Sequence, residues 1–235
     1  MIDTHCHLLP GLDDGPATID EAVELAIVMV AQGVKSVVCT PHLSRQFPVP
    51  QARALEALAA LELELERRRI DLPLTLAAEV SDVNAVTLGA AALRERSIGG
   101  RHLVVELAST TTAPAAESLT RRLAAMGLAP VIAHPERLEA VGRDPASVDG
   151  VRALGGLVQV TASGLTGRWG ESVAQVAWEL LATGRVDLVA SDAHGAHRRK
   201  CHLAEARELV CRRAGQACWD ELTTTAPTRL LEGAD

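Results

Sequence analysis

The sequence predicts an α/β protein in which parallel strands alternate with helices. Seven short apolar segments predicted to be strands alternate with helix-like segments rich in Ala, Leu and Glu, and the first strand opens the chain. The apolar segments are spread evenly over 235 residues without a linker, a repeat or a low-complexity run, so we expect one domain over residues 1–235. With no Tyr, one Phe and three Trp, the core is expected to consist mainly of Ala, Val and Leu.

The strands are predicted from short apolar runs that are bounded by turn residues. The first strand begins at the N-terminus and runs to His7, where the turn-rich segment 9–15 follows. The other strands are predicted at Val34–Thr40, Leu72–Val80, Arg101–Leu107, Pro130–Ala133, Gly156–Ala162 and Val186–Ala190.

The first helix is predicted over Ile19–Ala31. Thr18 is placed to be its N-cap, Glu21 follows three positions later as in a capping box, and Gly33 ends it. Further helices are predicted at Gln51–Arg69, Ala85–Arg96, Ala115–Gly127, Ala146–Gly155, Ser172–Gly184, Cys201–Gly215 and Asp220–Gly233.

Composition excludes several classes of function. The net charge of -7, the isoelectric point of about 5.6 and the scarcity of aromatic residues argue against binding of nucleic acid. The five cysteines are odd in number and form no CxxC pair, which is typical of a reducing cytosol. Without a signal peptide or a run of about 18 apolar residues, no membrane insertion is expected and the protein is predicted to be cytoplasmic.

Residues that can bind metals follow the predicted strands at their carboxyl ends. In a closed parallel β/α barrel these ends form one face, which is where active sites lie. Each such residue alone is more often a loop or core residue, but burying the whole set would be costly without a cation. The set comprises His5, His7, His42, Glu79, Glu106, His134, Asp192 and His194.

Imidazole and carboxylate ligands together suit Zn, Mn or Fe, and more than four ligands imply more than one ion. Such clusters are typical of enzymes that hydrolyse phosphoesters. Cys6 lies between two predicted ligands but points to the opposite side of its strand, so we expect it in the core. His102, His197 and His202 are expected to be structural or surface residues.

The opening segment Met1–Gly15 resembles that of the PHP (polymerase and histidinol phosphatase) superfamily. More narrowly, the chain resembles the bacterial manganese-dependent protein-tyrosine phosphatases that are encoded with capsule and exopolysaccharide genes. The resemblance continues in order at Thr40-Pro41-His42, Ala78-Glu79-Val80, Val105-Glu106-Leu107, Ala133-His134-Pro135-Glu136-Arg137, the segment 159–167 and Ser191-Asp192-Ala193-His194.

The resemblance implies a distorted (β/α)7 barrel of the TIM-like PHP type that holds three metal ions. His5, His7 and Asp192 would hold the first ion. Glu79 would bridge to a second ion, which Glu106 and His134 complete. The third ion would be held by Asp14, His42 and His194; the residues themselves do not distinguish Asp14 from Asp13, and either could simply form the turn.

Arg137 and Arg199 match positions that approach the substrate phosphate in the family, and a guanidinium suits the paired oxygens of a phosphate. The chain departs from the family where aromatic residues are common near the third and fourth strand ends. Val80, Ser81 and Leu107 stand there instead, which leaves open how an aryl ring would be held.

The leading hypothesis is a metal-dependent protein-tyrosine phosphatase that uses Mn, or alternatively Fe or Zn. Its substrate would be a phosphotyrosine protein, such as a bacterial tyrosine kinase of polysaccharide assembly. Two alternatives on the same metal site are a small-molecule phosphatase of the histidinol-phosphate type and a nucleotide phosphoesterase. A non-enzymatic alternative is a metal-binding docking module.

Overall fold

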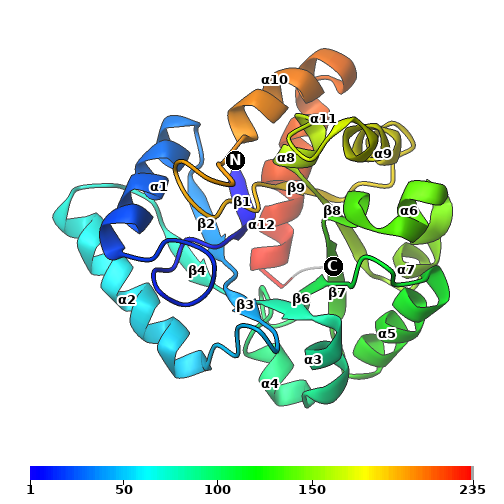
Figure 1. The fold of residues 1–235 in the computed structure, drawn as a ribbon, viewed down its shortest axis with the longest axis horizontal. Coiled ribbons are helices and arrows are strands. Elements are labelled where there is room, and N and C mark those ends of the chain that lie inside the picture. The colour runs from blue at the N-terminus through cyan, green and yellow to red at the C-terminus, as the bar shows by residue number, and fades with distance from the viewer. Residues whose placement is uncertain (234–235) are drawn as a thin grey trace.

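The computed structural model describes residues 1–233, in which parallel strands form the centre and helices surround them (Figure 1). All the strand pairs within the two sheets are parallel, in the orders β1-β2-β4 and β3-β5-β6-β7-β8-β9. The strands are β1 (Ile2–Cys6), β2 (Ser36–Cys39), β3 (His42–Leu43), β4 (Leu74–Leu76), β5 (Glu79–Ser81), β6 (His102–Glu106), β7 (Ala129–Ala133), β8 (Leu157–Thr161) and β9 (Leu188–Ala190).

The seven predicted strands are present, although one of them, Leu72–Val80, is interrupted: residues 77–78 separate β4 from β5. The strand predicted at Val34–Thr40 corresponds to β2, and the short β3 follows it after residues 40–41. The two sheets also meet where β1 lies beside the end of β9: the backbone N–H of His7 donates to Ala193 O, and that of Asp192 donates to His5 O. The strands therefore follow one another in a distorted ring whose carboxyl ends face the same way.

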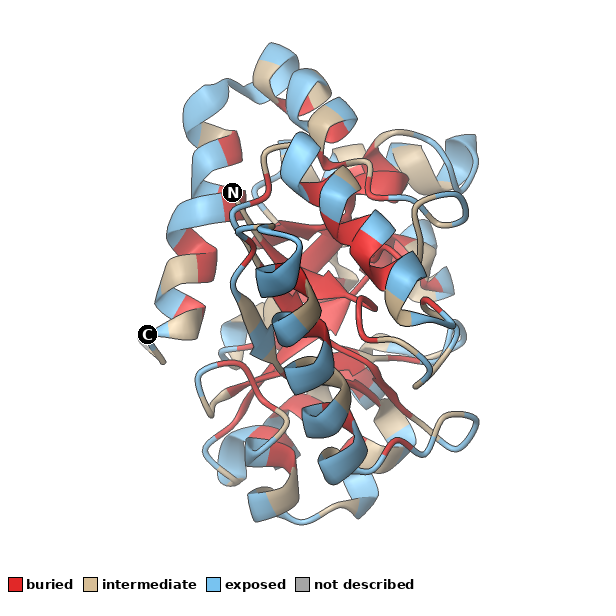
Figure 2. Cartoon of the chain, turned by 90° about the vertical axis from the view of Figure 1, so that its left-hand side faces the viewer, coloured by how far each residue is buried: buried red, intermediate tan, exposed pale blue. Residues whose placement is uncertain are grey.

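The helices cover the outside of this ring, and their outer faces are exposed while the strands are buried (Figure 2). Within residues 1–233, no helix is both long enough and apolar enough to span a membrane. The helices are α1 (Ile19–Ala31), α2 (Gln51–Arg67), α3 (Asp82–Thr87), α4 (Ala90–Arg94), α5 (Ala113–Ala125), α6 (Glu139–Arg143), α7 (Asp149–Ala153), α8 (Ala162–Leu165), α9 (Glu171–Ala182), α10 (Leu203–Ala214), α11 (Gln216–Asp220) and α12 (Ala226–Leu231).

Helix α1 begins as predicted. The Glu21 backbone N–H donates to Thr18 Oγ1 at 3.3 Å, which satisfies one of the free donors of the first turn. The Glu21 carboxylate accepts from the Ala17 N–H at 2.7 Å, one residue earlier than in a standard capping box.

Three helix predictions are wrong in detail. The helix expected at Ala85–Arg96 is two helices, α3 and α4, because Leu88 and Gly89 are extended between them. The helix expected at Ala146–Gly155 is a 3-10 turn (Pro145–Val148) followed by the short α7. The last predicted helix begins earlier, at α11, and contains a π-helical turn (Glu221–Thr225) just before Pro227, which lacks the N–H that an α-helical hydrogen bond needs.

Helix α12 closes the amino-terminal end of the strand ring. Its Ala226 and Leu230 belong to a buried cluster with residues from the strands, such as Val104, Val131 and Leu188. A second, larger cluster fills the space between the strands and the outer helices. Apolar side chains thus fill the amino-terminal end of the ring, whereas the polar side chains described below lie at its carboxyl end.

Candidate metal centre

The nine predicted ligands lie together at the carboxyl ends of the strands. His5 lies one residue before the end of β1 and His7 just after it, and Glu106 ends β6. His42 and Glu79 open the short strands β3 and β5, which follow β2 and β4, while the others lie in the loops that follow β1, β7 and β9. Most are buried, but the side chains of Asp14 and Glu106 are 43% and 40% exposed. The centre therefore has a buried floor, with two carboxylates near its opening.

Glu79 occupies the middle of this cluster. Its carboxylate is within 3.4 Å of imidazole nitrogens of four side chains, at 3.4 Å from His5 Nε2, 3.2 Å from His7 Nε2, 2.9 Å from His42 Nδ1 and 2.9 Å from His134 Nε2. Burial opposes ionisation of Glu79, but the surrounding histidines hold its pKa well below the ordinary value. Glu79 is therefore ionised at neutral pH, and its carboxylate is contacted by side chains from several strands.

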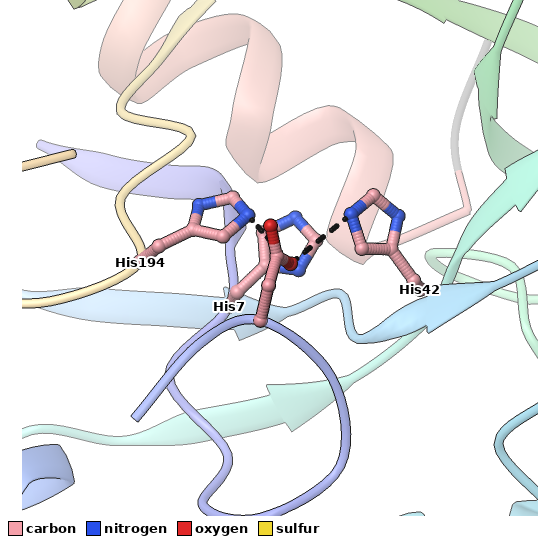
Figure 3. Close-up of side chains that lie close together, drawn as sticks. His7, His42 and His194 are labelled. Atoms are coloured by element: carbon pink, nitrogen blue, oxygen red, sulfur yellow. Dashed lines mark ion pairs between the residues drawn. The ribbon is translucent and has the colours of Figure 1, made fainter. Parts of the chain in front are cut away.

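Three sets of ligand atoms are each close enough to surround a cation, with all atoms of a set within 4.8 Å of one another. His7 and His42 each belong to two sets, and Figure 3 shows their rings converging with that of His194 from separate segments. The sets are His7, Asp14, His42 and His194; His5, His7 and Asp192; and His42, Glu79 and Glu106. They resemble the three-ion assignment expected above, with two differences: His7 joins Asp14, His42 and His194, and His42 stands where His134 was expected beside Glu79 and Glu106.

The structure distinguishes the two neighbouring aspartates. The Asp14 carboxylate lies 3.4 Å from His42 Nε2 and 3.2 Å from His194 Nε2, inside the cluster. Asp13 lies behind the cluster, where its Oδ2 accepts hydrogen bonds from His7 Nδ1 at 2.8 Å and from the His42 backbone N–H at 2.9 Å. Asp13 therefore orients His7, as Gln159 orients His5 by accepting from its Nδ1 at 2.8 Å.

The donor atoms fit metal ions. His194 Nε2 and Glu79 Oε2 are buried and make no hydrogen bond within the described part of the chain. Nevertheless, His194 Nε2 lies 3.2 Å from Asp14 Oδ1, and Glu79 Oε2 lies 2.9 Å from His42 Nδ1. Atoms crowded in this way, without hydrogen-bond geometry, are arranged as ligands rather than as a hydrogen-bonded network. Imidazole nitrogens and carboxylate oxygens without a thiolate favour Mn, Fe or Zn.

The local charge also favours cations. Burial opposes protonation of His7, yet its hydrogen bond with Asp13 and the neighbouring Glu79 raise the pKa of His7 to about 10. The pKa of Asp14 is lowered because its carboxylate lies against the His194 imidazole, with His42 and Arg199 also nearby. Protons and metal ions compete for the same nitrogen atoms, so metal binding at this centre would release protons.

Asp192 links the cluster to both predicted arginines. Its Oδ2 accepts from Arg137 Nη2 at 2.6 Å and from Arg199 Nη2 at 3.0 Å, and Arg199 Nη1 also donates to Asp14 Oδ2 at 3.0 Å. The other carboxylate oxygen of Asp192, Oδ1, lies 3.7 Å from His5 Nε2. Both guanidinium groups thus lie directly beside side chains of the cluster. A cleft of about 540 Å³ opens next to them, with Asp14, His194 and Arg199 among its lining residues.

Three of these side chains sit on strained backbone. His134, Asp192 and Arg199 have φ angles of 37°, 52° and 45°, in the left-handed region that residues other than glycine rarely adopt. Buried neighbours hold the first two loops in place. Glu136 accepts from both the backbone N–H and the hydroxyl of Thr161, and Asp3 accepts from the Ser191 N–H. Strained backbone of this kind is concentrated at functional sites.

The other histidines lie outside the cluster, in agreement with the expectation for them. His102 is buried at the start of β6, at the opposite end of the ring. His197 pairs with Glu24 on the surface, and His202 pairs with Glu205 beside α10. The cysteines are free thiols; Cys6 is buried as expected, and burial raises the pKa of the Cys6, Cys39 and Cys201 thiols.

Asp13→Asn is expected to weaken metal use without unfolding the protein. An amide has only one acceptor oxygen, so it cannot keep both the bond from His7 Nδ1 on Oδ2 and the bond from the Gly15 N–H on Oδ1. Loss of such an orienting bond typically costs about 10- to 100-fold in metal affinity or activity. The measurement is activity as a function of Mn concentration. The control is Asp71→Asn, at an exposed residue in the loop that follows α2. An unchanged Mn dependence would show that Asp13 only shapes the turn.

A parallel β/α ring with clustered imidazoles and carboxylates at its carboxyl ends is typical of metal-dependent hydrolases. Residues 1–232 match the model of one family, described as capsular polysaccharide synthesis, CpsB/CapC. The chain belongs to this family.

Its relatives carry phosphatase names. It is 29% identical over 228 residues to tyrosine-protein phosphatase YwqE of Bacillus subtilis, covering 96% of this chain and 90% of that protein. It is also 29% identical over 227 residues to the putative tyrosine-protein phosphatase CapC of Staphylococcus aureus, covering 94% and 87%. A solved structure from work on YwqE of B. subtilis and CpsB of Streptococcus pneumoniae, described as unique metal-dependent tyrosine phosphatases, superposes with a TM-score of 0.90 at 28% identity, covering 100% of this chain and 96% of that one.

Proposed function

We propose that the chain is one metal-dependent phosphatase domain that hydrolyses phosphotyrosine in a protein substrate. The observation that carries the proposal is the cluster around Glu79, which gathers imidazoles and carboxylates from most of the strand ends and has two arginines at its edge. The names of the relatives support phosphotyrosine as the substrate class.

Three ions, with Mn favoured over Fe or Zn, would be held by the predicted ligand sets. His5, His7 and Asp192 would hold the first, Glu79 would be shared with a second, and Asp14, His42 and His194 would hold the third. Glu106 and His134 would complete the second site. Bound ions of this kind activate water and neutralise the charge of a phosphoryl group.

Arg137 and Arg199 would bind the non-bridging oxygens of the phosphate. Their Nη atoms already point to Asp192, so a phosphate next to that carboxylate lies within their reach. Both Nε atoms are buried without a hydrogen-bond partner among the described residues, which leaves donors for an incoming anion. A guanidinium donates two parallel hydrogen bonds and so also orients the phosphorus for in-line attack.

No side chain is needed as a nucleophile in this mechanism. The thiols nearest the cluster, such as Cys6, are buried and have raised pKa values, so they remain protonated and unreactive at neutral pH. This separates the proposed enzyme from phosphatases that attack phosphorus with a cysteine thiolate.

The finer proposals concern the biological setting. The family description names capsular polysaccharide synthesis, which supports a substrate protein of capsule or exopolysaccharide assembly. The more specific proposals are that this substrate is a tyrosine kinase and that the enzyme acts in the cytoplasm. A phosphorylated protein tail can reach the centre through its exposed edge, where the Asp14 and Glu106 carboxylates lie.

Substrate preference tests the proposal. Protein loaded with Mn is expected to hydrolyse a tyrosine-phosphorylated peptide with a higher kcat/KM than histidinol phosphate or a nucleotide monophosphate, measured by phosphate release. A clear preference for histidinol phosphate or the nucleotide would replace the proposal with the corresponding small-molecule phosphatase. Mn-loaded protein that hydrolyses none of these, nor para-nitrophenyl phosphate, would indicate a docking module.

A further inference from the structure

Trp169 is an exposed aromatic residue beside the arginines of the metal centre. Its residue is 43% exposed, and it is the single aromatic among the large apolar residues that are exposed within residues 1–233. An indole left open to solvent next to a polar site is unusual, because large aromatic surfaces are normally buried against other side chains. The exposure of Trp169 beside the arginines therefore indicates a role in binding.

The loop that carries Trp169 is attached to the carboxyl end of the ring. It connects α8, which directly follows β8, to α9. Gly167 and Gly170 flank the tryptophan with φ angles of 75° and 96°, which shape the turn. Arg168 Nη2 lies 2.9 Å from Glu205 Oε2 and ties the loop to α10.

Trp169 contacts both arginines that are assigned to the phosphate. Arg137 Cζ lies 4.1 Å from the centroid of the indole, in the geometry of a cation–π contact, and Arg199 Cζ lies 5.9 Å from it. Both guanidinium groups also pair with Asp192. Asp192 and the indole therefore contact the same two guanidinium groups, which places the indole next to the metal centre.

We propose that Trp169 determines specificity for aryl phosphates by stacking on the aryl ring of the ester whose phosphate Arg137 and Arg199 bind. The inference rests on the proposed function. In a phosphotyrosine the ring is attached directly to the ester oxygen, so a bound phosphate brings the ring to within a few ångströms of its guanidinium partners. An indole that already contacts both guanidinium groups can reach that ring, while a phosphoserine side chain has no ring to offer it.

Two other places near the centre fit an aryl ring less well. Phe47 is half-buried, and its ring is stacked on the predicted metal ligand His42 at 5.4 Å between centroids with an interplanar angle of 10°, whereas Trp169 packs on the two arginines assigned to the phosphate. The cleft next to Asp14 has Arg198 and Arg199 in its lining but neither Trp nor Phe, so it offers no large aromatic ring on which an aryl group could stack.

Trp178 is a matched control within the same chain. Arg213 Cζ lies 4.0 Å from its ring centroid, nearly the same contact as that between Arg137 and Trp169. The Trp178 Nε1–H donates to Leu165 O at 3.0 Å, and its side chain packs against the core from α9. Trp178 has the arginine contact without the neighbouring metal centre.

The test uses two inhibitors that share a phosphonate group, phenylphosphonate and methylphosphonate, measured against the Mn-loaded enzyme. Trp169→Ala is expected to raise the inhibition constant of phenylphosphonate about tenfold, as the loss of a stacked aromatic pair implies, and to leave that of methylphosphonate nearly unchanged. Trp169→Phe should restore most of the affinity for phenylphosphonate. Trp178→Phe should change neither constant.

The comparison distinguishes stacking from support of Arg137. If Trp169 only positions that arginine, both constants rise together, because both phosphonates need the guanidinium, and this result would overturn the inference. An aryl-selective loss in Phe47→Ala but not in Trp169→Ala would also overturn it. Quenching of tryptophan fluorescence by phenylphosphonate, present in the wild type and lost in Trp169→Ala, gives a readout that does not depend on turnover. Wild-type enzyme that hydrolyses no phosphate ester would instead contradict the proposed function itself.

Discussion

Glu79→Gln is expected to lower kcat for para-nitrophenyl phosphate by at least about a thousandfold, since a carboxylate shared between ions contributes several kcal/mol of charge stabilisation. Glu79 is almost fully buried and lies within 3.4 Å of four imidazoles, so the amide would keep the volume and lose the charge. An amide NH2 would also place donor hydrogens against nitrogen atoms that should bind metal. Elemental analysis is expected to show fewer bound ions in the purified variant.

The matched control is Glu66→Gln, which makes the same chemical change on the exposed face of α2. It should leave both kcat and metal content unchanged. If Glu79→Gln kept full activity and full metal content, Glu79 would be a structural counter-charge for the histidines, and the ligand sets would have to be assigned without it.

Removal of metal with a chelator is expected to abolish activity and to lower the melting temperature. Each ion bound at about 100 times its Kd stabilises the folded state by about 2.7 kcal/mol, and 1 kcal/mol shifts Tm by about 2–4 °C in a chain of this size. A decrease of about 5–10 °C is therefore expected from the loss of even one ion. Phosphatase assays and thermal unfolding before and after chelation, followed by addition of Mn, Fe or Zn, measure both effects.

Thiol alkylation is the control for chelation. Cys211 and Cys218 are partly exposed and should react first, whereas Cys6, Cys39 and Cys201 are buried. Alkylation of the native enzyme should leave activity unchanged because no thiol belongs to the proposed mechanism. Activity that survives chelation but is lost on alkylation would point to a cysteine nucleophile and contradict the metal mechanism.

The strand ends were predictable from the sequence because apolar runs and the turn residues after them are local signals. For this reason His42 is expected just after one strand and Glu79 near the end of another, and the structure has both at the carboxyl face although β3 and β5 are separate short strands. The break at Leu88 and Gly89 was not predicted, since the segment around it has helical periodicity and the extended backbone there depends on its packing.

The parts of the site that could not be predicted depend on long-range contacts. Asp13 and Asp14 are chemically identical neighbours, and only the folded loop turns one toward His194 and the other toward His7 Nδ1. Gln159 reaches His5 across 154 positions of sequence, and Trp169 meets Arg137 only because their loops follow neighbouring strands. The Gly residues on either side of Trp169 mark a turn, but no local pattern indicates what the turn faces.

The left-handed backbone at His134, Asp192 and Arg199 implies a conflict between two kinds of selection. A residue other than glycine in this conformation costs about 1 kcal/mol or more, so glycine at any of the three positions would relieve backbone strain. Selection for folding alone would therefore drift toward glycine there, and the side chains persist only while a lineage still needs the chemistry. Homologues that have lost phosphatase activity are therefore expected to carry glycine at these positions first, while the rest of the strand ring is unchanged.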